Sequence, residues 1–326
     1  MNKNFYIFKY RNFSDMFSRK FLISLMIGTI YLSSVSCKNN SAKIGMLIAS
    51  PVFEPDLSYF SSLISKSGYE VISANANYDD KLQISQANEL INQGAEVLVI
   101  LPVNTNTAAA IVRLAHEKRV KTIAYERIIS NCKLDYFISF DNVQIGELLA
   151  KEALRLQPNG NYLVLNGDKF DRNAVWVREG FYKAMDASIK SGQIKVVYDS
   201  YIEDWSSDNA VYELDRYVRL SGNIPNVVLS AYSGMNARLF DYFVKETIFP
   251  MPVVAGQDMD SKEARAQLNP NQRISLFKSF KVEAEKAADL AKKLVNGQSI
   301  IVDQKVNNGL IDVKTILIKE MKVESH

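Results

Sequence analysis

Short apolar runs alternate with stretches of helical periodicity along almost the whole chain, and this alternation restricts the possible folds most strongly. The runs Lys43–Ile48 and Val97–Leu101 are continuous and apolar, as expected for strands covered on both faces. Between such runs, stretches such as Lys81–Gln93 place apolar residues at helical spacing and stop at a glycine, here Gly94. Elements that alternate at such short intervals predict an α/β fold with parallel strands and right-handed crossovers.

The alternation restarts after Asp141, so the sequence predicts two similar α/β halves. The stretch Ala49–Pro55 contains two prolines and predicts a loop, and we expect edge strands at Ile300–Val302 and Thr315–Ile318. The other predicted strands cover residues 43–48, 69–74, 97–101, 122–125, 136–140, 161–165, 194–199, 226–229, 253–256 and 273–277. The predicted helices cover residues 56–67, 81–93, 107–118, 143–156, 174–190, 207–220, 235–246, 262–268 and 282–295.

The composition excludes several classes of function. The chain has 326 residues, is 47% hydrophobic and 23% charged, and carries a net charge of only +3, so it is a folded protein without the basic surface that nucleic-acid binding needs. Two cysteines and two histidines are too few for a structural zinc site, and neither His116 nor His326 is well placed for a catalytic triad. Cys132 is most simply a lone thiol. No glycine-rich phosphate loop occurs, so we expect no enzyme activity, cofactor or metal.

The N-terminus is typical of a targeting segment. Arg19 and Lys20 precede the apolar run Phe21–Leu32, small residues follow, and the run is too short to span a bilayer comfortably. The tail from Ser34 to Cys37 resembles a bacterial lipobox, in which the cysteine becomes the lipidated first residue, although leucine is usual at the position of Ser34. We expect a signal and lipoprotein segment at 1–37 and a tether at 38–42. Plain secretion and an uncleaved anchor are the alternatives, and Met16 is an alternative start.

Charged and polar residues follow two successive predicted strands between Thr122 and Gly146. Glu126 and Arg127 come after the first strand, and Asp141 and Asn142 come after the second. In an open parallel sheet, ligands bind beyond the carboxyl ends of the strands. Carboxylates accept hydrogen bonds from hydroxyls, arginine donates, and asparagine does both, so this set of residues suits a neutral polyol. The alternative is that these residues are ordinary polar loop residues.

Five segments together resemble a known family. KIGM at 43–46, QGAEVLVILPVN at 93–104, YERII at 125–129, FISFDNVQIGELLA at 137–150 and GQD at 256–258 resemble the type I periplasmic sugar-binding proteins, among them the binders of xylose-like pentoses that serve bacterial ABC transporters. The resemblance implies two Rossmann-like lobes that close on a ligand cleft. It places three crossings near 140–141, 278–279 and 302–303. The first lobe would be 43–140 plus 279–301, including the last long helix, and the second 141–278 plus 302–318.

The same resemblance implies a set of ligand-binding residues. Trp205 falls where an aromatic ring stacks on the sugar, and its polar neighbours in EDWSSDNA favour a cleft-facing loop over a core position. The full set that the resemblance implies is Glu126, Arg127, Asp141, Asn142, Asn173, Arg178, Trp205, Asp258 and Lys278.

Other positions depart from the family pattern. Pro55 and Asp56 stand where the family has an Arg–Trp pair, and Ala231 and Tyr232 stand where it has an Asn–Asp pair. Phe53 or Phe60 could replace the lost stacking wall. Because an unmatched hydroxyl costs about 1–3 kcal/mol, these changes leave open another pentose, a modified sugar or no sugar at all.

The leading hypothesis is therefore an exported, lipidated solute-binding protein, periplasmic or at the cell surface. It would bind a small carbohydrate for an ABC permease and would be attached to the membrane through Cys37. The alternative is an extracytoplasmic sugar-sensing module that partners a membrane histidine kinase or chemoreceptor. A cytoplasmic repressor is disfavoured, since an export signal rather than a helix-turn-helix precedes Lys43.

Overall fold

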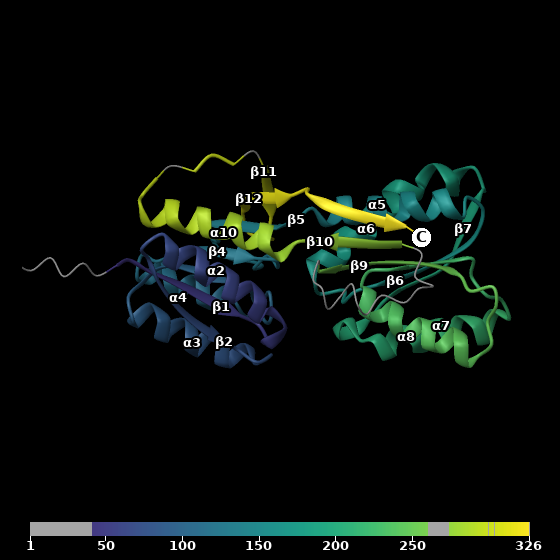
Figure 1. Ribbon diagram of the computed structural model, residues 1–326, viewed down its shortest axis with the longest axis horizontal. Coiled ribbons are helices and arrows are strands. Elements are labelled where there is room, and N and C mark those ends of the chain that lie inside the picture. Colours follow the sequence, from purple (N-terminus) through teal and green to yellow (C-terminus); the bar gives the residue numbers. More distant parts are fainter. Residues whose placement is uncertain (1–40, 260–273, 299, 303, 326) are drawn as a thin grey trace, which may run out of the picture. The chain divides into compact units, whose positions relative to one another are not determined.

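The computed structural model describes residues 41–259, 274–298, 300–302 and 304–325. These residues build two mainly parallel sheets, each belonging to one lobe (Figure 1). In the first lobe the strands are β1 (Lys43–Ile48), β2 (Glu70–Asn75), β3 (Ala95–Ile100), β4 (Lys121–Tyr125), β5 (Tyr136–Phe140), β11 (Gln304–Asn307) and β12 (Asp312–Ile318). In the second lobe they are β6 (Gly160–Asn166), β7 (Ile194–Tyr201), β8 (Val227–Ser230), β9 (Val253–Met259), β10 (Ile274–Lys278) and β13 (Met321–Ser325).

The strand order is β11-β12-β5-β4-β3-β1-β2 in the first sheet and β13-β10-β9-β8-β6-β7 in the second. Only the described pairings of β11 with β12 and of β13 with β10 are antiparallel. The predicted α/β fold is therefore confirmed. The helices of the first lobe are α2 (Glu54–Lys66), α3 (Asp80–Asn92), α4 (Ala109–Glu117) and α10 (Phe280–Val295). Those of the second lobe are α5 (Asn142–Leu156), α6 (Arg172–Lys190), α7 (Ser207–Ser221) and α8 (Ser233–Lys245).

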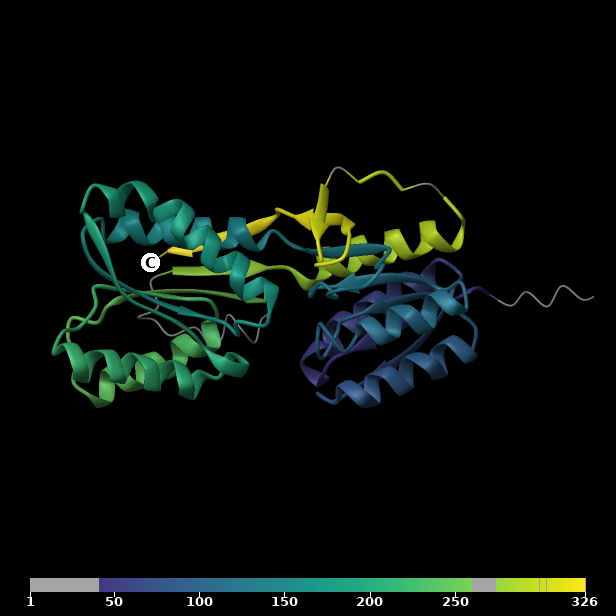
Figure 2. The same ribbon diagram turned by 180° about the vertical axis from the view of Figure 1, so that it is seen from behind.

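Helices cover both faces of each sheet, as the apolar strands require (Figure 2). One apolar cluster joins the first sheet to α2 and α10 and the second sheet to α5 and α6. A second cluster lies between the first sheet and α3 and α4, and a third lies between the second sheet and α7 and α8. Among the described residues, no helix is long and apolar enough to cross a membrane.

Two glycines let α5 and α6 pack with their backbones in contact. A Cβ atom at Gly146 would lie 2.0 Å from the carbonyl oxygen of Val177, and one at Gly180 would lie 2.1 Å from that of Val143. Only glycine permits this approach. The close packing fixes the N-termini of both helices beside each other, where Asp141 caps α5 and Asp171 caps α6.

The region predicted as a loop at Ala49–Pro55 contains helical structure. A 3-10 turn, η1, covers Pro51–Phe53, and α2 begins at Glu54 with a proline in its first turn. Proline is tolerated there because the first N–H groups of a helix have no partner within the helix. The predicted helix at 262–268 lies outside the described residues.

The C-terminal segment corrects the predicted division into lobes. β12 pairs in parallel with β5, with Ile318 opposite Phe140, and so belongs to the first sheet. Only β13 joins the second sheet, beside β10. The third crossing therefore lies between Ile318 and Met321 rather than near 302–303, and residues 300–302 form no strand. The sequence shows apolar runs in this segment, but it does not show which sheet has a free edge to pair with them.

The other two crossings lie where they were expected. The chain leaves β5 for α5 at Asp141, and it leaves β10 for α10 at Ser279. Helix α10 packs on α2 of the first lobe, where Tyr59 Oη donates to Glu285 Oε1 at 2.7 Å. The yellow strand β13 continues from β12 beside β10 in Figure 1, so the third crossing runs next to the second.

Candidate functional site

A cavity of about 400 Å³ lies between the carboxyl ends of the strands of the two lobes. Each sheet contributes residues that directly follow its strands, which is where parallel sheets bind ligands. We call this space the inner cavity. It is lined by Ser50, Val52, Phe53, Tyr78, Glu126, Arg127, Asn142, Asp171, Asn173, Asp204, Trp205, Ala231, Tyr232, Gln257 and Lys278.

A second cavity of about 670 Å³ adjoins the first. We call it the outer cavity. The two spaces have Tyr78, Arg127, Asp171, Asp204 and Trp205 in common, so they are parts of one cleft. The outer cavity is further lined by Val103, Asn104, Thr105, Asn106, Asp168 and Phe170.

Glu126 is held rigidly at the end of β4. Its backbone has a φ of 63°, in the left-handed region that costs energy for any residue with a side chain. Its N–H donates to Ile138 at 2.9 Å, and Ser139 Oγ donates to the Glu126 carbonyl at 2.9 Å and to Oε2 at 3.2 Å. Lys278 Nζ lies 3.1 Å from the other carboxylate oxygen. The carboxylate is therefore fixed in position before any ligand binds.

Lys278 and Glu126 belong to a buried charge cluster that also contains Asp56, Tyr125 and Glu283. Burial alone would lower the pKa of Lys278, but the nearby carboxylates Glu126 and Glu283 outweigh it, and the pKa is raised. Burial, with a contribution from Glu126, raises the pKa of Glu283 well above its usual range. Glu283 is therefore a weaker acid than an exposed glutamate, because burial disfavours its charged form, while the charge of Lys278 acts in the opposite direction on its pKa.

Asp56 is also buried in this cluster, beneath the cavity wall. Tyr125 Oη donates to Asp56 Oδ1 at 2.7 Å. Burial raises the pKa of Asp56 to about 6, with a further increase from Glu126, while the bond from Tyr125 and the charge of Lys278 act in the opposite direction. The residue that replaces the family's Trp is therefore an internal part of the first lobe and does not line the cavity.

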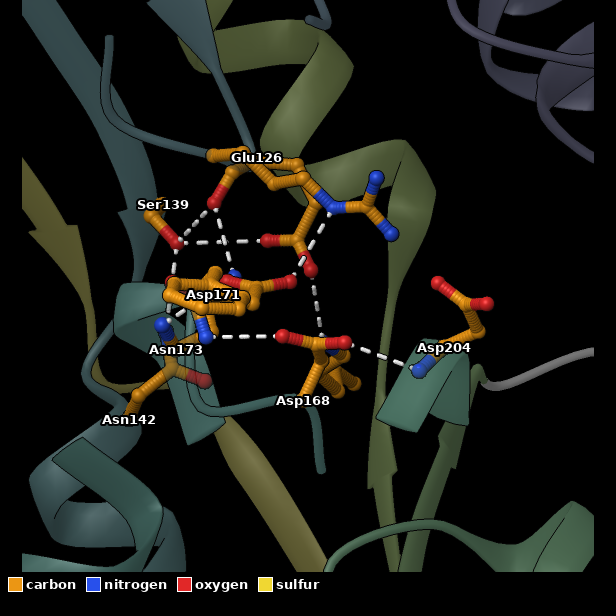
Figure 3. Close-up of polar contacts among 10 residues, drawn as sticks. Glu126, Ser139, Asn142, Asp168, Asp171, Asn173 and Asp204 are labelled. Atoms are coloured by element: carbon orange, nitrogen blue, oxygen red, sulfur yellow. Dashed lines mark hydrogen bonds and ion pairs between the residues drawn. The ribbon is translucent and has the colours of Figure 1, made fainter. Parts of the chain in front are cut away.

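Besides the pair of Glu126 and Lys278, two further contacts between described residues join the lobes beside the inner cavity (Figure 3). Asn173 Nδ2 donates to the Glu126 carbonyl at 3.1 Å, and Arg127 Nε lies 3.3 Å from Asp171 Oδ2. Burial raises the pKa of Asp171, whereas the charge of Arg127 and the N–H of Asn173 lower it. The loop after β4 is thus attached to the N-terminus of α6.

Three amide oxygens at the cavity wall have no partner within the part of the chain that the structure describes. They are Asn142 Oδ1, Asn173 Oδ1 and Gln257 Oε1. All three residues are buried. A buried acceptor without a partner costs about 1–3 kcal/mol, and a hydroxyl donor in the cavity would remove that cost. The arrangement therefore favours a ligand with several hydroxyl groups.

Trp205 forms an aromatic wall that both cavities share. It belongs to η2 (Glu203–Trp205), and its indole packs closely on Gly167, where an added Cβ would lie 2.3 Å from the ring. Asp204 and Trp205 both have a φ of 54°, and Asp168 Oδ2 accepts the Asp204 N–H at 2.8 Å. The ring is therefore held by backbone contacts on the side of the second lobe.

The structure brings most of the predicted site residues to one place. Glu126, Arg127, Asn142, Asn173, Trp205 and Lys278 all line the inner cavity.

Two of the predicted residues do not reach the cavity. Asp141 caps α5, and its Oδ1 accepts the Gln144 N–H at 3.0 Å. Arg178 pairs instead with Asp199 of β7, with 3.0 Å between Nε and Oδ2, and its guanidinium lies over Tyr182. Neither Asp141 nor Arg178 lines either cavity. The side chain of Asp258 and the whole of Cys37 lie outside the described residues.

Sequence reasoning missed several residues of the site. Gln257 stands beside the predicted Asp258, and the GQD segment near the end of β9 was a sufficient signal for either residue. Glu283 is a charged residue on the buried side of α10, and a carboxylate in an otherwise apolar helical stripe was a usable signal. Of the two phenylalanines considered as replacement walls, Phe53 lines the inner cavity and Phe60 is buried in the core.

The described residues offer little for catalysis. No group of three or more His, Cys, Asp or Glu side chains among them could hold a metal ion. Burial raises the pKa of the Cys132 thiol to about 11, so it remains protonated and unreactive at neutral pH.

Comparison with known proteins agrees with this geometry. The model of the periplasmic binding protein domain family matches residues 48–299. The chain is 30% identical to the D-xylose-binding periplasmic protein of Haemophilus influenzae, over 92% of this chain and 91% of that protein. It is 29% identical to the protein of the same name from Escherichia coli, over 94% of each. An ABC transporter solute-binding protein from Clostridium phytofermentans, solved with bound β-D-glucose, matches with a TM-score of 0.77 and 21% identity, over 87% of this chain and 94% of that one. The chain therefore belongs to the periplasmic binding protein family, whose members bind solutes rather than convert them.

Proposed function

We propose that the protein binds a neutral sugar, a xylose-like pentose or a related monosaccharide, in the inner cavity between its lobes. One observation carries the proposal: the same cavity is lined by a fixed carboxylate, a guanidinium, an indole wall and three residues whose buried amide oxygens have no described partner. Each of these groups matches one feature of a sugar ring.

The polar groups of the cavity match hydroxyls in number and kind. Glu126 and the amide oxygens of Asn142, Asn173 and Gln257 accept hydrogen bonds, while the Arg127 guanidinium donates them. Asp171 adds a second carboxylate close to Arg127. Several carboxylates around one cavity disfavour phosphate groups, so we expect the free sugar to bind rather than its phosphate.

The shape of the cavity also matches a sugar. The flat face of Trp205 suits the C–H face of a pyranose, and Phe53 of the first lobe lines the same cavity. Tyr232, which is 38% exposed, also lines it, and with Ala231 it stands where other members of the family have an Asn–Asp pair. This change favours a ligand that differs from D-xylose in at least one hydroxyl contact.

We infer further that the protein delivers the sugar to an ABC permease from outside the cytoplasm. Similarity to two D-xylose-binding periplasmic proteins supports this role. We also propose that Cys37 is acylated and anchors the protein to the membrane. Replacement of Cys37 by alanine should release the protein from the membrane fraction into the soluble fraction, and retention of the variant in the membrane would contradict the anchor.

A thermal-shift panel of pentoses, hexoses and their phosphates tests the binding proposal. A ligand that binds only the folded state stabilises it by about 2.7 kcal/mol at a hundred times its Kd. We expect one neutral pentose or hexose to raise the melting temperature and its phosphate to have no effect. If no sugar raises the melting temperature, the proposal is wrong, and a protein partner or a sensor role becomes the better account of the fold.

A further inference from the structure

We propose that the outer cavity is a second sugar subsite, so that the cleft accepts a disaccharide or glycoside whose first ring lies in the inner cavity. The inference rests on the proposed function, because it extends the same cleft. It assigns a ligand class to a space that the monosaccharide would leave open.

The size and continuity of the cleft are the first observation. The outer cavity has a volume of about 670 Å³ and the inner one about 400 Å³. Trp205 and Arg127 line both, so a ligand held against the indole in the inner cavity has a direct path outward. A single pentose ring cannot fill both spaces.

Two aromatic side chains of opposite lobes line the outer cavity. Tyr78 of the first lobe is 66% exposed, and Phe170 of the second is 71% exposed. Both rings are accessible to a ligand, and the faces of aromatic side chains stack on the C–H faces of sugars. Lys169 Nζ lies over the Phe170 ring, 4.9 Å from its centroid.

The backbone around these aromatics is fixed. Tyr78 has a φ of 68°, and its N–H donates to Ala49 at 2.8 Å. The Phe170 N–H donates to Asp168 Oδ1 at 2.7 Å. A positive φ at a bulky residue costs energy and is found mainly where a side chain must be presented in a particular direction. Both rings are therefore presented by ordered loops.

The polar groups of the outer cavity also suit a neutral sugar. Asn104 Oδ1 accepts the N–H groups of residues 106 and 107 at 2.9 and 3.2 Å, which orients its amide nitrogen as a donor. Asp168 and Asp204 add carboxylate acceptors, and Arg127 is the cation shared with the inner cavity. This excess of carboxylates disfavours an anionic second group, such as a phosphate or uronate.

The contacts between the lobes determine whether the outer cavity persists. Arg127 already lies 3.3 Å from Asp171, and Asn173 already bonds to Glu126 beside the inner cavity. The lobes therefore meet at the inner end while about 670 Å³ remains at the outer end. The inner end of the cleft is thus already closed, while the outer end leaves room for a second ring.

Calorimetric titration of the purified protein with D-xylose, xylobiose, D-glucose and cellobiose tests the inference. We expect one disaccharide to bind at least about threefold more tightly than its monosaccharide. Phe170 lines the outer cavity alone, so Phe170→Ala should weaken disaccharide binding by about threefold to tenfold and leave monosaccharide binding unchanged. Tyr212, an aromatic residue of similar exposure (63%) outside both cavities, provides the control variant Tyr212→Ala, which should change neither affinity.

Two results would overturn the inference, and they are distinguishable. Binding of a monosaccharide with much weaker binding of its disaccharide, or equal loss of both ligands in the Phe170 variant, would contradict the second subsite and leave the proposed function intact. Failure of all four sugars to bind would contradict the proposed function and the inference together.

Discussion

On one side of the inner cavity Glu126 and Lys278 pair at 3.1 Å above other buried ionisable groups, whereas on the other side three amide oxygens have no described partner. In the buried charge cluster, Glu126 pairs with Lys278 and Asp56 with Tyr125, and among its described groups only Glu283 Oε1 has no hydrogen-bond partner. The second-lobe wall, made of Asn142, Asn173, Trp205 and Gln257, leaves its acceptors to be satisfied by a ligand. The comparison predicts that substitutions in the cluster mainly lower the free energy of unfolding. Substitutions in the wall should mainly lower the affinity for sugar.

The largest effect is expected when the lysine of the cluster is removed. Lys278→Met leaves Glu126 without its cation in a buried site, and such a loss costs about 3–5 kcal/mol of unfolding free energy. Urea denaturation measures it. The control is Lys293→Met, which breaks the exposed pair with Asp289 and should change stability by less than about 1 kcal/mol. Similar small losses in both variants would show that the cluster does not stabilise the fold.

Asp56 should make stability depend on pH. An ordinary aspartate has a pKa of 3.8, whereas the pKa of Asp56 in the folded protein is about 6. The folded state therefore binds the proton more tightly than the unfolded state. Its contribution to stability is therefore present at low pH and is lost as pH rises from about 4 to about 6, by up to about 3 kcal/mol.

The Asp56→Asn variant isolates this effect. It keeps an acceptor for Tyr125 and removes the titration, so it should be more stable than the wild type at pH 7.5 and should lack the loss between pH 4 and 6. Urea denaturation across this range checks it. If the free energy of unfolding depends on pH in the same way in both proteins, the pKa of the Asp56 carboxyl is not raised by burial.

On the second-lobe wall, Trp205→Ala should weaken sugar binding at least about tenfold, because it removes the stacking surface. Its unfolding free energy should change much less than that of Lys278→Met. The two tryptophans of the chain, Trp176 and Trp205, also provide a fluorescence test. Sugar should change the emission of a Trp176→Phe variant, in which only Trp205 remains, and should leave that of Trp205→Phe nearly unchanged. The reverse pattern would place the ligand elsewhere.

A smaller effect is expected for one unpartnered amide. Gln257→Met should weaken sugar binding by about threefold to tenfold, the value of one hydrogen bond near 1 kcal/mol, with little change in stability. Gln86 is the matched control, because its Oε1 is also buried without a described partner but lies outside both cavities. Gln86→Met should leave affinity unchanged. Equal affinities of the wild type and the two variants would show that the amide oxygen of Gln257 does not bind the sugar.

The sequence predicted the fold well, because apolar periodicity directly determines which segments are strands and helices. It did not predict the partner of β12, since two sheets of similar composition compete for the same apolar strand. The first half of the site followed from residues at strand ends, as with Glu126 and Arg127. Arg178 was wrongly placed because its pairing with Asp199 depends on how α6 lies against β7, which no local pattern reveals. Glu283 was missed because it approaches Glu126 only through the packing of α10 on the first lobe.

The most direct test of a ligand site between the lobes compares two arginines that the sequence alone could not tell apart. Calorimetric titration with the sugar found by the thermal-shift panel should show that Arg127→Ala weakens binding at least about tenfold, because a charged donor in the cavity is lost. Arg178→Ala, which removes the pair with Asp199 and the contact with Tyr182 but no residue that lines either cavity, should bind within about twofold of the wild type. Unchanged affinity in Arg127→Ala, or a larger loss in Arg178→Ala, would contradict the site.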